Sequence, residues 1–123
     1  MEKDERVVEM RRKTYVILTI FYASLIFVLS SFPKVPTIER PFLDKLEHVI
    51  EYSVLGFLAV SCFKKIDRKT IILAILITSL YGVLDEFHQY FVPGRDFSIF
   101  DILADSVGGL LGVRIRSGAR KIS

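Results

Sequence analysis

Four apolar blocks, separated by short polar segments, constrain this chain more than any other feature of its sequence. They cover residues 14–32, 43–63, 70–91 and 97–113. The first block has no charged side chain. At about 1.5 Å of helical rise per residue it is long enough to cross the ~30 Å hydrocarbon core of a bilayer. Hydrophobic residues make up 51% of the 123 positions, more than is usual in a soluble domain of this size. We therefore predict an all-α fold, a bundle of four transmembrane helices.

The first block has a rival interpretation as the apolar core of a cleaved signal peptide, because basic residues precede it. It is long for such a core and lacks a clear small-x-small cleavage site. We therefore expect a retained helix.

The basic residues are distributed unevenly around these blocks. If the N-terminus is cytoplasmic, 13 of the 17 Lys and Arg residues fall in three cytoplasmic segments. We assign these as an N-terminal segment over residues 1–13, a loop over 64–69 and a tail over 114–123, with a membrane domain over 14–113. The positive-inside rule then predicts a multi-pass protein of the cytoplasmic membrane with both termini inside. The basic residues left outside are Lys34, Arg40, Lys45 and Arg95.

This distribution also argues against nucleic acid as a partner. The basic residues lie in separate segments that flank lipid-spanning helices, where anionic lipid headgroups are nearer.

The third block ends in ionisable and amide side chains, which are costly in lipid and so need a reason. With both termini cytoplasmic, this end lies at the extracytoplasmic face, together with the starts of the second and fourth helices. We therefore expect the polar residues of the three ends to form one outward-facing acidic pocket. They are Asp44, His48, Glu51, Asp85, Glu86, Gln89, Arg95, Asp101 and Asp105.

Helical spacing places many of these residues on shared faces. One face of the second helix carries Asp44, His48, Glu51 and Tyr52. One face of the fourth helix carries Asp101, Asp105, Gly108 and Gly112. The two glycines have the small-xxx-small spacing that lets another helix approach closely, so we expect them at a helix–helix contact.

Asp44 and Ser98 are also candidates for helix capping. Each begins a capping-box pattern, with Glu47 and Asp101 respectively three residues later. Capping does not explain the acidic pair of the third helix, because the dipole at a helix C-terminus disfavours negative charge. We expect one member of that pair to meet Arg95 across the short turn that follows.

A few residues have plainer interpretations. The single cysteine, Cys62, cannot form an internal disulfide, and we expect it to be a packing residue. Tyr52 and Tyr81 are candidates for interface anchors, since tyrosine prefers that depth. His88 is expected at the headgroup boundary.

Three classes of function fit such a pocket. The first is a metal-dependent, membrane-embedded enzyme that acts on a phosphate-bearing or lipid-linked substrate at the outer leaflet, with His48, Asp85 and Glu86 as its catalytic residues. A divalent cation would be held by His48, Asp85, Glu86 and Asp101. Oxygen ligands favour Mg²⁺ or Ca²⁺, and an imidazole also allows Mn²⁺ or Zn²⁺. Lys45, Arg95 and the N-terminal amides of the fourth helix would receive a phosphate.

The second class is a binding module without turnover, whose partners are membrane lipid and a lipid headgroup or other envelope ligand. Its ligand-binding residues would be Lys45, Tyr52, Gln89, Arg95, Asp101 and Asp105. The third class is a transporter, for which four helices without an internal repeat would need a homo-oligomer. The residues alone leave these classes open.

Three polar motifs occur in order on separate helices. They read Asp44-Lys45-x-x-His48-x-x-x-Tyr52, then Tyr81-Gly82-x-x-Asp85-Glu86-x-x-Gln89-x-x-x-Pro93-Gly94-Arg95, then Asp101-Ile102-Leu103-Ala104-x-x-x-Gly108. Over residues 40–113 they resemble the VanZ-like family of small integral membrane proteins, and depart from it at Asp105, where the family pattern usually has asparagine. The resemblance implies a cell-envelope protein related to a teicoplanin-resistance factor, with an effect on glycopeptide susceptibility. It favours the binding module over the enzyme.

Overall fold

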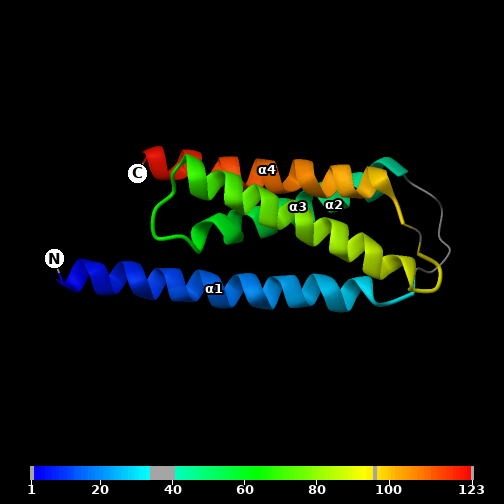
Figure 1. Cartoon of the computed structure of the whole chain (residues 1–123), viewed down its shortest axis with the longest axis horizontal. Coiled ribbons are helices and arrows are strands. Elements are labelled where there is room, and N and C mark those ends of the chain that lie inside the picture. Colours follow the sequence, from blue (N-terminus) through cyan, green and yellow to red (C-terminus); the bar gives the residue numbers. More distant parts are fainter. Residues whose placement is uncertain (1, 34–40, 96, 123) are drawn as a thin grey trace.

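The computed structural model describes residues 2–33, 41–95 and 97–122, with the backbone alone at residues 41 and 119–122. Within these ranges it contains four helices and no strand, so the prediction of an all-helical chain with four helices is confirmed. They are α1 (Glu2–Ser30), α2 (Pro41–Ser61), α3 (Arg68–Tyr90) and α4 (Ile99–Ile122). The helices lie side by side, and α1 begins at the same end of the bundle at which α4 finishes (Figure 1). Lys34 and Arg40, two of the basic residues expected outside, fall beyond the described residues.

Two helices are longer than the apolar blocks that predicted them. α1 begins at Glu2 rather than at residue 14, and α4 continues to Ile122 rather than ending at residue 113. The added segment of α1 is rich in Glu, Arg, Lys and Met, which are good helix formers, and contains no Gly or Pro. Glu9 and Arg12 also pair across one turn, at 3.2 Å. Apolar content therefore marked the lipid-compatible part of these helices and not their ends.

A capping box fixes the start of α3. The Asp67 carboxylate accepts a hydrogen bond from the Thr70 backbone N–H at 3.0 Å, and the Thr70 hydroxyl accepts one from the Asp67 backbone N–H at 2.9 Å. The Thr70 N–H keeps the pKa of the Asp67 carboxyl below its usual value. The cap ends the turn between α2 and α3 at the end of the bundle that also holds both ends of the chain (Figure 1).

Glycine allows α2 and α4 to approach unusually closely. A Cβ atom added to Gly112 would lie 1.8 Å from the carbonyl oxygen of Ser53, and one added to Gly108 would lie 2.4 Å from that of Val49. A Cβ atom added to Gly56 would likewise lie 2.4 Å from the carbonyl oxygen of Gly109. Because only glycine fits such backbone contacts, these positions hold the polar start of α4 directly against the start of α2.

The outside of the bundle is strongly apolar. On α1, Ile17 and Phe21 are each 67% exposed, and large exposed apolar side chains occur on every helix. α1 and α3 each contain an 18-residue window of mean hydropathy 1.7 and are long and apolar enough to cross a membrane. Several carboxylates, in contrast, are buried. An apolar exterior around buried acids suits a lipid environment better than water.

Candidate functional site

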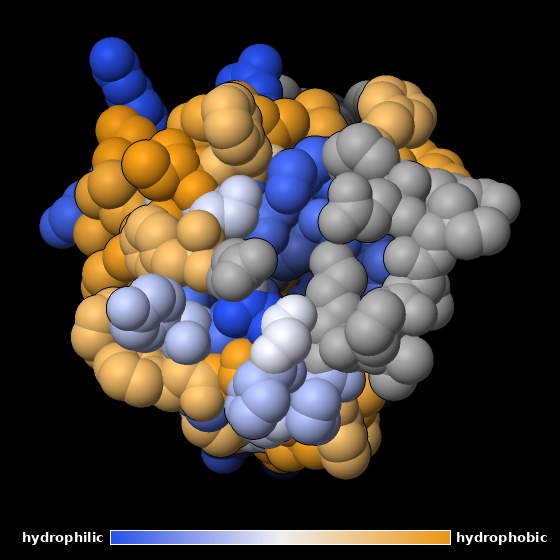
Figure 2. Space-filling view, turned by 90° about the vertical axis from the view of Figure 1, so that its right-hand side faces the viewer, coloured by the Kyte–Doolittle hydropathy of each residue, from blue (hydrophilic) through white to orange (hydrophobic). Residues whose placement is uncertain are grey.

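The buried polar groups gather at one end of the bundle, where α1 and α3 finish and α2 and α4 begin. Viewed from this end, a hydrophilic area lies within a hydrophobic rim (Figure 2). Glu86 and Asp105 are fully buried, and Asp85, Gln89 and Asp101 are at most 7% exposed. The structure thus brings together the ends of the three helices that the sequence placed in one layer.

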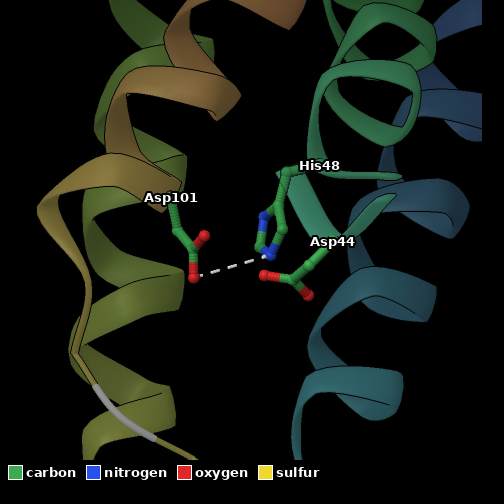
Figure 3. A group of neighbouring side chains, drawn as sticks. All are labelled: Asp44, His48 and Asp101. Carbon is green, nitrogen blue, oxygen red and sulfur yellow. Dashed lines mark ion pairs between the residues drawn. The ribbon is translucent and has the colours of Figure 1, made fainter. Parts of the chain in front are cut away.

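His48 joins α2 to the two acids of α4. Its Nδ1 atom lies 2.8 Å from Asp105 Oδ1, and its Nε2 atom lies 3.7 Å from Asp101 Oδ2 (Figure 3). Lys45 adds an ion pair with Asp101 and a second with Asp44, the latter at 3.3 Å. His48 is therefore flanked by a carboxylate at each ring nitrogen, an arrangement that orients the ring.

Asp85 of α3 accepts hydrogen bonds from two neighbours. The Tyr52 hydroxyl donates to Asp85 Oδ2 at 3.1 Å, and the Gln89 amide donates to the same oxygen at 3.3 Å. Tyr52 is fully buried, which corrects its interpretation as an interface anchor. Tyr81 is partly buried and donates to the carbonyl oxygen of Ala23 on α1, so it connects helices.

Glu86 caps a helix other than its own. One of its oxygens accepts the Ser98 backbone N–H at 3.1 Å, and the Ser98 hydroxyl accepts the Asp101 N–H at 3.3 Å. The expectation that capping could not explain Glu86 was wrong, because α3 ends where α4 begins and its carboxylate satisfies an N-terminal amide there. The Glu86 carboxylate binds the Ser98 N–H group, which the Asp101 side chain would bind in the expected capping box. Asp44 lies within the first turn of α2, which begins at Pro41, and not at its N-cap.

Arg95 does not make the ion pair expected with Asp85 or Glu86. Its Nε and Nη2 atoms donate to the carbonyl oxygens of Phe32 and Leu29, at 2.9 and 3.3 Å. It thereby satisfies carbonyls at the C-terminal end of α1, where a cation is favourable. His88 lies beside this contact, with its Nε2 atom 2.9 Å from the Ser31 hydroxyl.

Three buried carboxylate oxygens have no hydrogen-bond partner among the described residues: Asp85 Oδ1, Glu86 Oε1 and Asp105 Oδ2. Two groups of potential metal ligands also occur there, each with its ligand atoms within 4.8 Å of one another. One is Asp44, His48 and Asp101, and the other is His48, Glu86 and Asp105. Neither includes Asp85, which the sequence analysis had placed among the metal ligands.

A cavity of about 240 Å³ opens at this end of the bundle. Two of the six expected ligand-binding residues, Gln89 and Arg95, line it. The other four lie outside the lining: Lys45, Tyr52, Asp101 and Asp105. Next to it lies an apolar groove of about 320 Å³ along α2, lined by Leu43, Leu46 and Ile50. The cavity and the groove share two lining residues, Glu47 and Glu51. The cavity is lined by Ile26, Leu29, Ser30, Asp44, Glu47, His48, Glu51, Gln89 and Arg95.

The sequence analysis missed the contribution of α1 to this cavity. Ile26, Leu29 and Ser30 come from the apolar first block, which carries no polar signal that would mark a site. Glu47 was assigned only to capping.

A protein-family model described as VanZ/LLP1 matches residues 4–117. The chain belongs to the VanZ/LLP1 family. The match confirms the resemblance carried by the three polar motifs and extends it to α1, which those motifs do not include. No match to this VanZ/LLP1 chain was found among curated proteins or among solved structures.

The motif residues of this VanZ/LLP1 chain bind one another across its helices. Tyr52 of the first motif meets Asp85 of the second, and Lys45 of the first meets Asp101 of the third. Asp105, at which the chain departs from the family pattern, binds His48. The VanZ/LLP1 motifs thus form two polar groups that each join different helices, one of Tyr52, Asp85 and Gln89 and the other of Lys45, His48, Asp101 and Asp105.

Proposed function

We propose that this VanZ/LLP1 protein is a multi-pass membrane protein that binds the headgroup of an amphipathic envelope ligand in its acidic cavity, and through it affects glycopeptide susceptibility. One observation carries the proposal: the polar cavity and the apolar groove of α2 adjoin and share Glu47 and Glu51. A ligand with a charged headgroup and a hydrocarbon chain has the same two-part character. Such a ligand could place its headgroup in the cavity and its chain in the groove.

The arrangement of charge supports four membrane-spanning helices with the cavity on the extracytoplasmic side. Both ends of the chain and the basic turn between α2 and α3 lie at the end of the bundle opposite the cavity (Figure 1). At that end Arg116 donates to the Ser61 hydroxyl at 2.8 Å, and Lys64 approaches Glu9 at 3.9 Å. A concentration of Lys and Arg at one end is typical of the cytoplasmic side.

The charges lining the cavity favour a headgroup that carries an ammonium group. Three carboxylates line it, from Asp44, Glu47 and Glu51, together with the guanidinium group of Arg95, and Asp44 already pairs with Lys45. Arg95 already donates to carbonyl oxygens of α1, and His48 already faces two aspartates below the cavity. The carboxylates of Glu47 and Glu51, which make no ion pair among the described residues, are therefore available to an ammonium group, and the volume of about 240 Å³ suits a headgroup rather than a whole lipid.

Phosphatidylethanolamine is expected to bind more tightly than phosphatidylglycerol, because only the former carries an ammonium group. Native mass spectrometry of the full chain in detergent, with each lipid added in turn, measures this preference. Glu51→Gln removes a carboxylate common to the cavity and the groove, and we expect it to weaken phosphatidylethanolamine binding about tenfold, or about 1.4 kcal/mol.

Glu9→Gln, which alters a carboxylate at the opposite end of the bundle, serves as the matched control and is expected to leave binding unchanged. Equal binding of the two lipids, or equal effects of the two substitutions, would contradict the proposal.

A membrane-embedded enzyme is the second candidate, favoured by the surroundings of His48. The imidazole lines the cavity while its nitrogens face Asp105 and Asp101, as in the oriented histidines that act as general bases. Turnover of a phosphate-bearing lipid that is lost in His48→Gln would favour this candidate over binding alone.

A further inference from the structure

Below the cavity, side chains from three helices bring potential metal ligands together. One nitrogen of His48 on α2, one oxygen of Glu86 on α3 and one oxygen of Asp105 on α4 lie within 4.8 Å of one another. Small side-chain rotations would suffice to reach the metal–ligand distances of about 2.0–2.2 Å. We infer that His48, Glu86 and Asp105 bind a divalent transition-metal ion.

Both carboxylates have a buried oxygen that is available to a cation. Glu86 and Asp105 are fully buried, yet Glu86 Oε1 and Asp105 Oδ2 have no hydrogen-bond partner among the described residues. Buried polar atoms are nearly always paired, and a buried carboxylate oxygen left alone is costly. A metal ion at this position would satisfy ligands on both residues at once.

The local balance of charge points the same way. Four carboxylates are buried at this end, from Asp85, Glu86, Asp101 and Asp105. Lys45 pairs with Asp101, whereas His48, the other partner in the described structure, must be neutral to bind a metal ion. A divalent ion would change the net charge of the four carboxylates and Lys45 from −3 to −1 without requiring another basic side chain.

The outer group of potential ligands, Asp44, His48 and Asp101 (Figure 3), is the weaker site. It is less buried than the inner group, and the Lys45 ammonium already pairs with both of its aspartates. A metal ion there would have to displace Lys45. At the inner site His48 can use Nδ1, the nitrogen beside Asp105, while Nε2 faces Asp101. A carboxylate behind a metal-bound imidazole commonly orients the ring.

The ligand set favours Zn²⁺ or Mn²⁺ over Mg²⁺ or Ca²⁺. An imidazole nitrogen suits transition metals, while carboxylates also accept Mn²⁺. The proposed metal site thus contains Asp105 in place of Asp85 and Asp101, which the sequence analysis had placed among the metal ligands. Three protein ligands leave a coordination position for water or for a ligand reaching down from the cavity.

Metal binding is tested on the full chain purified in detergent, stripped with EDTA and titrated with Zn²⁺ or Mn²⁺ alone. We expect saturable binding by the wild type, weakened at least about tenfold in Glu86→Gln and in Asp105→Asn. Glu86→Gln keeps an oxygen that can accept the Ser98 N–H, so α4 retains its cap. The matched control is Glu9→Gln, which alters a carboxylate at the opposite end of the bundle and should leave affinity unchanged.

A spectroscopic readout on the wild type does not depend on how well the variants fold. Pulsed electron paramagnetic resonance of the Mn²⁺-loaded chain should show coupling to an imidazole nitrogen. No saturable binding by the wild type, a bound Mn²⁺ without nitrogen coupling, or equal effects of Glu9→Gln and Glu86→Gln would overturn the inference. It does not rest on headgroup binding, because no lipid ligand is added. A chain that binds the ion and ignores phosphatidylethanolamine would contradict the proposed function alone.

Discussion

Replacing Gly112 with alanine is expected to lower the free energy of unfolding by about 1–3 kcal/mol, the usual cost of overpacking. The added methyl group would lie 1.8 Å from the Ser53 carbonyl oxygen. The obstructing atom belongs to the backbone, which cannot rotate away as a flexible side chain can. α2 and α4 must therefore separate, and the contacts of His48 with Asp101 and Asp105 between them should weaken as well. Titration with SDS in mixed micelles, followed by far-UV circular dichroism, measures the change.

Gly118 supplies a matched control in the same helix. A Cβ atom added there would meet no side chain or other helix of the described residues within 4 Å, so Gly118→Ala should raise stability by up to about 1 kcal/mol through helix propensity alone. If the two substitutions change stability in the same direction, the close packing of α2 on α4 does not control the fold.

Tyr52→Phe is expected to cost about 1–3 kcal/mol of stability, because it removes one of the two hydrogen-bond donors to a buried carboxylate. Asp85 Oδ2 would keep only the longer hydrogen bond from Gln89, and Asp85 Oδ1 has no partner among the described residues. The same SDS titration measures the loss. In an Asp85→Asn background the cost should be smaller, since the neutral amide needs less stabilisation.

Tyr90→Phe is the control, because Tyr90 is 63% exposed and its substitution should change stability by no more than about 0.5 kcal/mol. Equal costs for Tyr52→Phe and Tyr90→Phe would show that the buried hydrogen bond does not contribute. Because Tyr52 does not line the cavity, its loss should not change the preference for phosphatidylethanolamine.

The sequence predicted the helices and the convergence of their polar ends because both depend on local patterns. Apolar length marks helices that suit lipid, and i, i+4 spacing places His48 and Tyr52 on one face. The charge distribution aligned the three helix ends and so placed Asp85 and Asp105 in the same layer, but the individual pairs His48–Asp105 and Tyr52–Asp85 come from the structure. The motifs also predicted the VanZ/LLP1 family, which the match over residues 4–117 shows.

Other features depend on contacts between helices, which spacing within one helix does not determine. Glu86 caps α4, and Arg95 binds carbonyl oxygens of α1, although proximity in sequence suggested that Arg95 would pair with an acid. One wall of the cavity also comes from α1, through the uncharged side chains of Ile26, Leu29 and Ser30. Residues of this kind become recognisable only when the packing of all four helices is known.

The central claim, that the acidic cavity faces the extracytoplasmic side of a membrane-spanning bundle, is tested most directly by thiol accessibility. In a Cys62→Ser background, Glu47→Cys places a thiol at the cavity, and Lys69→Cys places one at the opposite end of the bundle. Intact cells are treated with a membrane-impermeant maleimide. We predict labelling of Glu47→Cys alone, and labelling of Lys69→Cys only after the membrane is opened. Labelling of Lys69→Cys in intact cells, with Glu47→Cys protected, would contradict this account.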